Sequence, residues 1–511
     1  MFGLWGKLRK ADGPSAASGP DAKAAAKVLP ALAAADFVGV RHFASIWDDS
    51  AHHVADLNGA LGNELADALF ACGEPQSPSP LGRIVVGQAG AGKTHLMGDL
   101  RRTVWERRGW FVLLDLGGVR DFWTTAALNY LDALHKPHPS GRTQGQELLA
   151  RISVLRAAGQ PRNARQFNAV FRADDDRILE LATRTVQALR HDHWDRTQRY
   201  QQIIRAFVMH QGRNVAAWDE AMNWLQGVVV EGSRLGPAPA ARDVVAALSW
   251  LMSLTGPTLL AIDQIDPIVT AAHHALDGGD PDTEEQRKAR AIVDNLAIGL
   301  MDLYDVTRRT LTVVTALEES WTALNRHALK SATARFSTPP ARLTLIPNAV
   351  VAERLVAVRL AQAYAAHEVT PPYPTYPFRA GAFAGAVDML PRDLLIRCRE
   401  HVQRCLAGGA VTELARFSED SAPAETGDGT DFDTRLRTLA ADLPADGLPE
   451  VDDAVGFRRL LFDVLHCRGL ETDPAGDIAF AIDDEPDRVD PPDRARTTGR
   501  IGALSEPERQ T

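Results

Sequence analysis

The sequence predicts an α/β fold, in which a parallel sheet lies between layers of helices and is extended by a large helical insertion and a helical C-terminal region. Two observations predict it. Four short apolar runs have the length of buried strands, and the segments between them carry apolar residues at helical spacing. Those long connections leave room for the crossover helices that parallel strands need. A chain of 511 residues, 45% of them apolar, has enough material for such a core and for further domains.

The elements are predicted in chain order. The first 35 residues are rich in Ala, Gly, Ser and Pro, so we expect them to be disordered or weakly helical. A helix is expected next, because Leu57, Leu61, Leu65 and Leu69 recur every four residues along one face. The four strands are predicted at residues 83–86, 110–115, 258–262 and 311–315.

These elements predict a division into domains. We expect residues 36–345 to form the α/β core, with a helical insertion at about 121–250, because the second and third strands lie much further apart than a compact core requires. Residues 346–410 are expected to form a helical lid. An acidic linker follows at 411–433, since its second part has six acidic residues and no basic one. A small C-terminal domain is expected at 434–482, with one strand at 478–482, and a disordered tail at 483–511.

Composition restricts the class of protein. The formal net charge of −10 argues against a chain that coats nucleic acid through bulk positive charge. We expect no membrane span, because no run approaches the roughly 18–20 consecutive apolar residues that a spanning helix needs. Four cysteines in so long a chain are no disulfide framework, and Cys398 and Cys405 are expected to be buried thiols on one helix face. A reducing, cytoplasmic compartment is therefore expected.

The strongest functional signal follows the first predicted strand. It fits the pattern G-x-x-x-x-G-K-[ST] at every fixed position, and its residues are Gly87, Gln88, Ala89, Gly90, Ala91, Gly92, Lys93 and Thr94, with His95 next. Glycines allow consecutive backbone N–H groups to point at phosphate oxygens, and a helix that begins here adds its positive end. Lys93 is expected on the β- and γ-phosphates and the Thr94 hydroxyl on Mg²⁺. The sequence therefore predicts a site for ATP and Mg²⁺.

A phosphate-binding loop of this kind also needs a carboxylate that orders the metal. The third predicted strand is an apolar run that ends in Asp263, followed by Gln264, Ile265 and Asp266. Asp263 alone could be a solvated strand end, but together with the loop it is better explained as the metal-ordering acid. We therefore expect Thr94 and Asp263 to hold Mg²⁺.

The order of these motifs resembles the AAA+ ATPases, and among them the origin-recognition and replication-initiator branch. The resemblance covers about residues 37–406. Residues 37–41, Phe-Val-Gly-Val-Arg, are similar to a box that packs beside the adenine in that branch. Residues 263–266 are similar to its aspartate-glutamate-hydrophobic-aspartate box. The resemblance implies a P-loop core, a helical lid and homo-oligomers.

The resemblance also implies roles for three further residues. Thr315 matches the sensor that detects the γ-phosphate, although it could simply end a buried strand. Arg335, in an Arg-Phe pair, matches the arginine finger supplied to a neighbouring subunit, although it could be an ordinary surface arginine. Arg392, in Leu-Pro-Arg-Asp at the start of a lid helix, matches the sensor that reaches back to the nucleotide, although it could be a solvated charge.

One departure from the family concerns catalysis. The residue after Asp263 is expected to be a glutamate that polarises the attacking water, and here it is Gln264. An amide orients water but cannot take its proton, so we expect slow hydrolysis. Asp266, Glu318 or Glu319 could replace the missing base. The Asp-Gln pair also resembles signalling NTPases of the STAND class.

Two functions follow as hypotheses. The first is a slow ATP-dependent switch that assembles with copies of itself and loads or activates a protein partner, such as a nuclease or helicase, on double-stranded DNA. Trp218, Trp224, Leu225 and Gly227 loosely resemble ATPases of bacterial anti-phage defence operons, so a defence role is included. The alternative is a STAND-like scaffold that senses a protein partner with little turnover. A purely structural nucleotide-binding protein is a third possibility, which leaves the intact loop without a purpose.

Overall fold

A computed structural model of the chain describes residues 22–37, 46–47, 54, 56–116, 121–154, 175–212, 215–228, 232–263, 265–270, 283–327, 333–417, 479–482 and 501–504. It divides into two units, Met1–Pro423 and Ala424–Thr511. In the described part of the second unit, β8 (Ala479–Ile482) pairs antiparallel with β9 (Ile501–Leu504). The strand expected at 478–482 is thus present, whereas β9 lies in the segment expected to be disordered.

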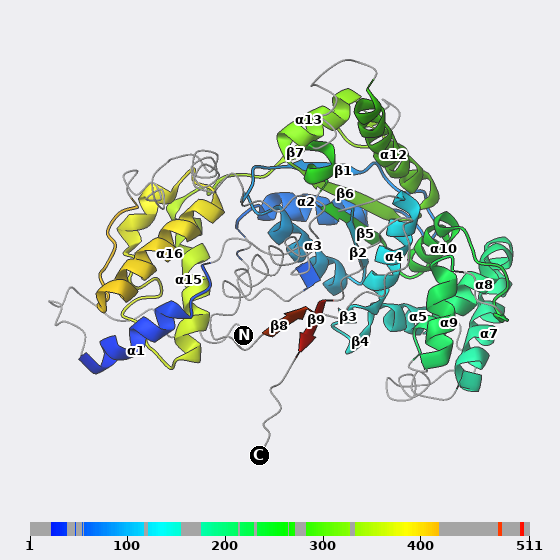
Figure 1. The fold of residues 1–511 in the computed structure, drawn as a ribbon, viewed down its shortest axis with the longest axis horizontal. Helices are drawn as coiled ribbons and strands as arrows, with labels where there is room; N and C mark the ends of the chain where they lie inside the picture. Colours follow the sequence, from blue (N-terminus) through cyan, green and yellow to red (C-terminus); the bar gives the residue numbers. More distant parts are fainter. Residues whose placement is uncertain are drawn as a thin grey trace, which may run out of the picture. The chain divides into compact units, whose positions relative to one another are not determined.

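The first unit is built on a parallel sheet of five strands in the order β2-β5-β6-β1-β7 (Figure 1). The strands are β1 (Arg83–Val86), β2 (Trp110–Asp115), β5 (Thr258–Asp263), β6 (Thr310–Ala316) and β7 (Ala341–Arg342). The predicted α/β fold, with a parallel sheet between layers of helices, is confirmed, and the four predicted strands occur within one residue of their expected bounds. The fifth strand, β7, was not predicted, because two residues without an apolar run give no strand pattern.

Helices cover both faces of this sheet, because side chains alternate along each strand between two apolar cores. On one face, Phe111, Leu113, Leu259 and Ala261 pack against α2 (Gly59–Phe70) and α3 (Lys93–Glu106). On the other face, the alternate strand residues pack against two helices of the insertion, α4 (Phe122–His135) and α10 (Ala241–Ser253). They also pack against α12 (Glu284–Val306), which follows β5. A fourth helix, α13 (Glu318–His327), follows β6.

The described residues of the segment expected to be a helical insertion form helices and one short β-hairpin. After α4 come the hairpin β3 (Pro137–His138) and β4 (Arg142–Thr143), then α5 (Gln144–Val154), α7 (Asp175–Asp192), α8 (Trp194–His210) and α9 (Val215–Leu225). The buried apolar residues of these helices belong to the same core as one face of the sheet. The insertion therefore continues the core, rather than forming a separate lobe with a core of its own.

The region expected to be a lid has its own apolar core. It contains α15 (Ala349–Ala366), a 3₁₀ helix, η3 (Ala380–Ala386), and α16 (Pro391–Gly408), and Cys398 and Cys405 are both buried on α16, as expected. The N-terminal segment joins this core. Residues Ala22–Ala33 form α1, whose Val28 and Leu32 are buried in the same cluster as Leu355. This segment was expected to be disordered or weakly helical; α1 is helical, and its apolar side chains are buried in this core.

Several expectations concern residues outside the described ranges. These include residues 1–20, Gln264, most of the acidic linker and most of the small C-terminal domain. Within the described ranges, none of the helices combines the length and apolar character needed to cross a bilayer.

A buried glutamine fixes the edge of the sheet to the insertion. Gln144, the first residue of α5, is fully buried. Its Oε1 accepts hydrogen bonds from Trp105 Nε1 at 2.8 Å and Phe111 N at 3.0 Å. Its Nε2 donates to the carbonyl oxygens of Phe111 and Ala133, both at 2.9 Å. One side chain thus satisfies buried polar groups on α3, β2 and α4.

We predict that Gln144→Leu lowers the free energy of unfolding by about 3–5 kcal/mol, because several buried donors and acceptors lose their partner at about 1–3 kcal/mol each. Chemical denaturation measures this. Gln198→Ala, at an exposed position of α8, is the control and should change the free energy by less than about 0.5 kcal/mol. Equal losses for the two variants would contradict the role assigned to Gln144.

A pair of histidines packs inside the insertion. His135 Nε2 of α4 lies 3.0 Å from His210 Nδ1 of α8, and the His210 ring stacks on Trp218 with centroids 5.7 Å apart. Burial is the main cause that lowers the pKa of His210 to about 3, and His135 lowers it further. Burial also lowers the pKa of His135. Both rings are therefore held neutral in the folded chain.

The sign of the pH dependence follows. A histidine whose pKa is depressed by folding contributes stability above its unfolded pKa of about 6.5, and this contribution is lost as the pH falls toward the folded value. We predict that His210 alone lowers the free energy of unfolding by about 2 kcal/mol when the pH falls from 7 to 5. Denaturation at both pH values should show a smaller loss for His210→Phe than for the wild type. The exposed His191→Ala should keep the wild-type dependence, and an unchanged slope in His210→Phe would contradict the assignment.

Candidate nucleotide site

The glycine-rich loop joins β1 to α3, as expected. The backbone turns through left-handed conformations at Gly90 (φ 85°) and Gly92 (φ 99°), which side chains with a Cβ rarely adopt, and α3 begins at Lys93. Gln88 and Ala89 are exposed at the tip of the loop. In the first turn of α3, His95 Nε2 lies 3.6 Å from Asp99 Oδ2. The loop thus places the N-terminus of a 14-residue helix at the carboxyl edge of the sheet.

Lys93 closes the loop on itself. Its Nζ donates to the carbonyl oxygen of Gly87 at 2.7 Å and to that of Gln88 at 3.4 Å. Partial burial lowers the pKa of Lys93, while the nearby carboxylates of Asp266 and Asp263 raise it. The ammonium group is therefore held within the loop, close to the two acids that were predicted to act with it.

The Asp263 carboxylate is hydrogen-bonded to two other residues that were predicted to belong to the site, Thr94 and Thr315. Asp263 ends β5 and is 4% exposed. Its Oδ2 accepts a hydrogen bond from Thr94 Oγ1 at 3.1 Å, and its Oδ1 accepts one from the Thr315 hydroxyl of β6. The Asp263 carboxylate and the Thr94 hydroxyl supply the kind of oxygen ligand that Mg²⁺ prefers. The residues present therefore fit the expected metal site.

Asp266 lies beside this cluster but has another partner. Its Oδ1 accepts a hydrogen bond from Leu317 N at 2.7 Å, at the start of α13. Of the other two acids considered as bases, Glu318 forms an exposed ion pair with Arg342 of β7, and Glu319 is exposed on α13. Gln264 lies outside the described residues.

Arg392 brings the helical lid to the loop. It is the second residue of α16, directly after Pro391. A Cβ on Gly90 would lie 2.6 Å from the Cβ of Arg392 and 2.8 Å from its Cδ. The stem of Arg392 thus lies against the glycine, and position 90 is closed to larger residues by contact as well as by its φ.

Arg335 is not brought to this cluster. Its carbonyl oxygen accepts from Gly82 N at 2.9 Å, so it lies at the amino end of β1, whereas the loop follows the carboxyl end. Its guanidinium is 3.5 Å from Asp305 Oδ1 and 5.3 Å from the centre of the Tyr304 ring. Within one chain, Arg335 therefore occupies the edge of the sheet opposite to the loop.

One acid at the carboxyl edge was missed by the sequence analysis. Asp115 ends β2 and is paired in register with Asp263 on the neighbouring β5. The signal was present, because residues 110–115 and 258–263 share the pattern of an apolar strand closed by an aspartate. Asp115 belongs to none of the motifs found in the sequence, so this pattern alone did not single it out.

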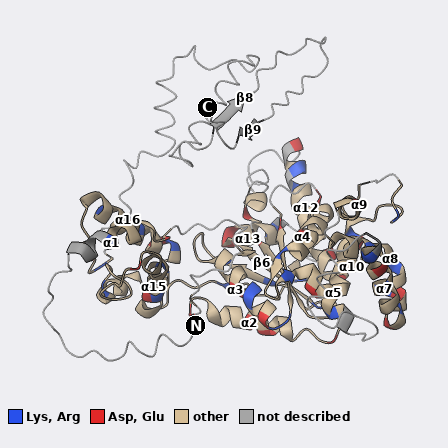
Figure 2. Cartoon of the chain, turned by 90° about the horizontal axis from the view of Figure 1, so that it is seen from below, with Lys and Arg blue, Asp and Glu red and all other residues tan. Residues whose placement is uncertain are grey.

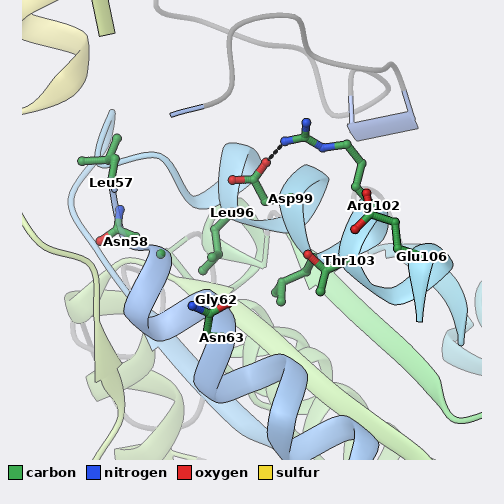
Figure 3. A pocket seen from close by; sticks show the side chains of 11 residues that line it. Leu57, Asn58, Gly62, Asn63, Leu96, Asp99, Arg102, Thr103 and Glu106 are labelled. Carbon is green, nitrogen blue, oxygen red and sulfur yellow. Dashed lines mark hydrogen bonds and ion pairs between the residues drawn. The ribbon is translucent and has the colours of Figure 1, made fainter. Parts of the chain in front are cut away.

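A pocket of about 210 Å³ lies beside the loop helix, between α2 and α3 (Figure 3). Leu57, Leu96 and Leu100 line it together with Asn58 and with polar residues further along α3, among them the ion-paired Asp99 and Arg102. Its volume is below the roughly 300–1,000 Å³ of typical ligand pockets. It also extends along α3 away from Lys93, so the phosphate site is the loop and not this pocket.

No family model matches the sequence, and no curated protein matches it. Two solved structures are similar at 10% identity: Cdc6p from Pyrobaculum aerophilum, with a TM-score of 0.33 over 72% of this chain and 66% of that one, and the Aeropyrum pernix ORC2 protein in ADPNP–ADP complexes, with a TM-score of 0.34 over 86% of this chain and 91% of that one. This chain thus spans just under two thirds of the first structure. At such scores the similarity carries no argument about function, which rests on the site itself.

We predict that Thr315→Val lowers the free energy of unfolding by about 1–3 kcal/mol, because the buried Asp263 carboxylate loses a hydroxyl donor while the shape of the side chain is kept. Denaturation of the nucleotide-free protein measures the loss. Thr322→Val, at an exposed position of α13, is the matched control. A Thr315→Val protein as stable as its control would contradict the assigned hydrogen bond.

Proposed function

We propose that the chain binds ATP with Mg²⁺ and hydrolyses it, as the sequence motifs suggest. One observation carries the proposal: Asp263 joins Thr94 of the loop and Thr315 of the neighbouring strand, directly beside Lys93. An unrelated glycine-rich turn would need no buried carboxylate aimed at the hydroxyl that follows its lysine. The arrangement is the one that phosphoryl transfer by P-loop NTPases requires.

Each residue has a definite task in this proposal. The backbone N–H groups of residues 87–94 and the N-terminus of α3 bind the phosphates. Lys93 exchanges the carbonyl oxygen of Gly87 for phosphate oxygens, which are stronger acceptors for an ammonium group. Thr94 and Asp263 would hold Mg²⁺, which neutralises the charge that develops on the β- and γ-phosphates. Arg392, already against Gly90, supplies a cation from the lid.

The proposal includes assembly with copies of the same chain. Arg335 lies at the opposite edge of the sheet from its own loop, so it can complete a site only in another molecule. A cation supplied in trans makes turnover depend on association. Gln264 in place of a glutamate favours slow turnover, and together these features favour a switch over a motor.

The partner is proposed from the order of the motifs and from the surface charge. The initiator-like motif order favours a switch that loads or activates a nuclease or helicase on double-stranded DNA, and the loose likeness to defence ATPases extends this to phage defence. Figure 2 shows basic and acidic residues interspersed over the described helices. Some of them form exposed ion pairs, such as Arg199–Asp243. Such a surface favours contact with DNA through a partner over binding by bulk charge.

The alternative is a STAND-like scaffold with little turnover, and the Asp263-Gln264 pair favours it. The two functions predict different rates of ATP hydrolysis and different retention of ADP. A scaffold of this kind should retain ADP on purification and turn over negligibly, whereas the AAA+-type switch should hydrolyse ATP, with faster turnover when DNA or its partner is present.

We predict that Lys93→Ala loses ATP turnover, because the β- and γ-phosphates lose the lysine of the loop. Phosphate release, measured with and without double-stranded DNA, tests this. Lys288→Ala removes an exposed lysine paired with Glu284 and should keep wild-type turnover. Turnover that persists in Lys93→Ala would reject the proposed site.

The same assay separates the two candidate functions. Turnover that requires Lys93 and rises with DNA supports the switch. Tightly bound ADP with negligible turnover, indifferent to DNA, supports the scaffold. A protein that stays monomeric with ATP and Mg²⁺ at micromolar concentration rules out the role of Arg335 in trans.

A further inference from the structure

The residue before α2 is bonded to the segment that joins the α/β core to the lid. Asn58 lies directly before α2 and has a left-handed backbone conformation, with φ at 58° (Figure 3). Its Oδ1 accepts a hydrogen bond from Thr344 N at 2.9 Å and another from the Thr344 hydroxyl at 3.0 Å. Thr344 follows β7, and Ile346 is already buried in the apolar core of the lid. The side chain of Asn58 thus holds the point at which the chain passes from the core to the lid.

This point is connected to the start of α16. Ile346 forms two backbone hydrogen bonds with the turn that precedes α16: its N–H donates to Met389 O at 3.0 Å, and its carbonyl oxygen accepts from Asp388 N at 3.0 Å. Arg392 follows in the first turn of α16, and its stem lies against Gly90 of the phosphate loop. A shift of the segment that Asn58 holds therefore shifts Arg392 relative to the loop.

The residues just before Asn58 are attached to the lid as well. Val54 and Leu57 are buried in the apolar core of the lid, where α1 also packs. Asp56 forms an exposed ion pair with Arg354 of α15. Apolar packing, this ion pair and the two hydrogen bonds of Asn58 thus fasten the lid to the start of α2.

We propose that Asn58 is a positioning residue that sets the hinge of the lid and thereby holds Arg392 at the phosphate loop. The inference rests on the proposed nucleotide binding and deepens it, because it names a residue that controls how long the nucleotide stays bound. Asn58 acts through Thr344 and the segment that follows it. With both hydrogen bonds in place, the lid keeps the cation of Arg392 beside the phosphates. Without them, the lid moves more freely about this hinge, and the nucleotide is released faster.

Two substitutions at position 58 separate the hydrogen bonds from the backbone conformation. Asn58→Gly keeps the left-handed conformation without steric cost and removes the acceptor. Asn58→Asp keeps an acceptor oxygen for both donors of Thr344. The first substitution should therefore release the hinge, and the second should preserve it.

The first readout is the dissociation rate of a fluorescent ATP analogue, bound with Mg²⁺ and displaced by excess ATP. We expect Asn58→Gly to raise this rate about 3–10-fold, because two hydrogen bonds of a half-buried side chain are lost. Asn58→Asp should keep the wild-type rate. Asn223→Gly, the same change at an exposed position of α9, is the matched control and should also keep it. Equal rates for Asn58→Gly and the wild type would overturn the inference.

A double-mutant cycle tests whether Asn58 acts through Arg392. Arg392→Ala should raise the dissociation rate by itself. Adding Asn58→Gly to it should have little further effect, because the cation that the hinge positions is already absent. A merely structural role of Asn58 would instead give additive effects of the two substitutions, and that result would also overturn the inference.

The distance between two spin labels in the nucleotide-free protein gives an independent readout. Asn63→Cys on α2 and Gln403→Cys on α16 place labels at exposed positions of the core and the lid. Cys467→Ser is added, and the native cysteines Cys72, Cys398 and Cys405 are buried. Asn58→Gly should broaden the distribution of label distances, whereas Asn58→Asp should not.

The two readouts separate the inference from the proposed function. Wild-type protein that binds the analogue, with the same distance distribution and the same dissociation rate in Asn58→Gly, overturns the inference and leaves nucleotide binding in place. Wild-type protein that does not bind the analogue overturns the proposed function, and the label distances then decide whether Asn58 fixes the hinge.

Discussion

The buried carboxylate of Asp263 is the constraint on which the nucleotide site depends. A carboxylate that is 4% exposed must be satisfied by hydrogen bonds, and here its partners are the hydroxyls of Thr94 and Thr315. These bonds tie the first turn of α3 to the ends of β5 and β6. The position of the loop relative to the sheet is therefore set by the same residue that would order the metal. Stability and chemistry are coupled at this point.

The long insertion leaves this edge intact because of where it packs. Its helices extend the core on the face of the sheet that carries α4 and α10, whereas the loop helix α3 covers the other face. Gln144 of α5 joins the insertion to β2 through two hydrogen bonds with Phe111, and it makes two more with Trp105 of α3 and Ala133 of α4. The described helices of the insertion thus support β2 from the face of the sheet opposite to α3. The insertion separates β2 from β5 in the sequence, and yet the ends of these two strands are neighbours in the sheet.

The sequence predicted what depends on local pattern and missed what depends on pairing. Strands β1, β2, β5 and β6 follow from apolar runs, and the loop follows from its motif. Strand β7 has only two residues and exists because it pairs with β1. Helix α1 lies in a segment of low complexity and is ordered by docking on the lid core. Asp115 needed the strand order and register, which no single-strand pattern contains. The placement of Arg335 opposite its own loop likewise required the three-dimensional structure.

The most direct test of the account is the Mg²⁺ dependence of ATP binding. We predict that the wild type binds a fluorescent ATP analogue more tightly with Mg²⁺ than with excess chelator. Asp263→Asn should abolish that difference while retaining the chelator-insensitive binding that the loop provides. Lys93→Ala should weaken binding under both conditions. Equal binding by all three proteins, or a full Mg²⁺ response in Asp263→Asn, would contradict the assignment of Asp263 as the residue around which the site is built.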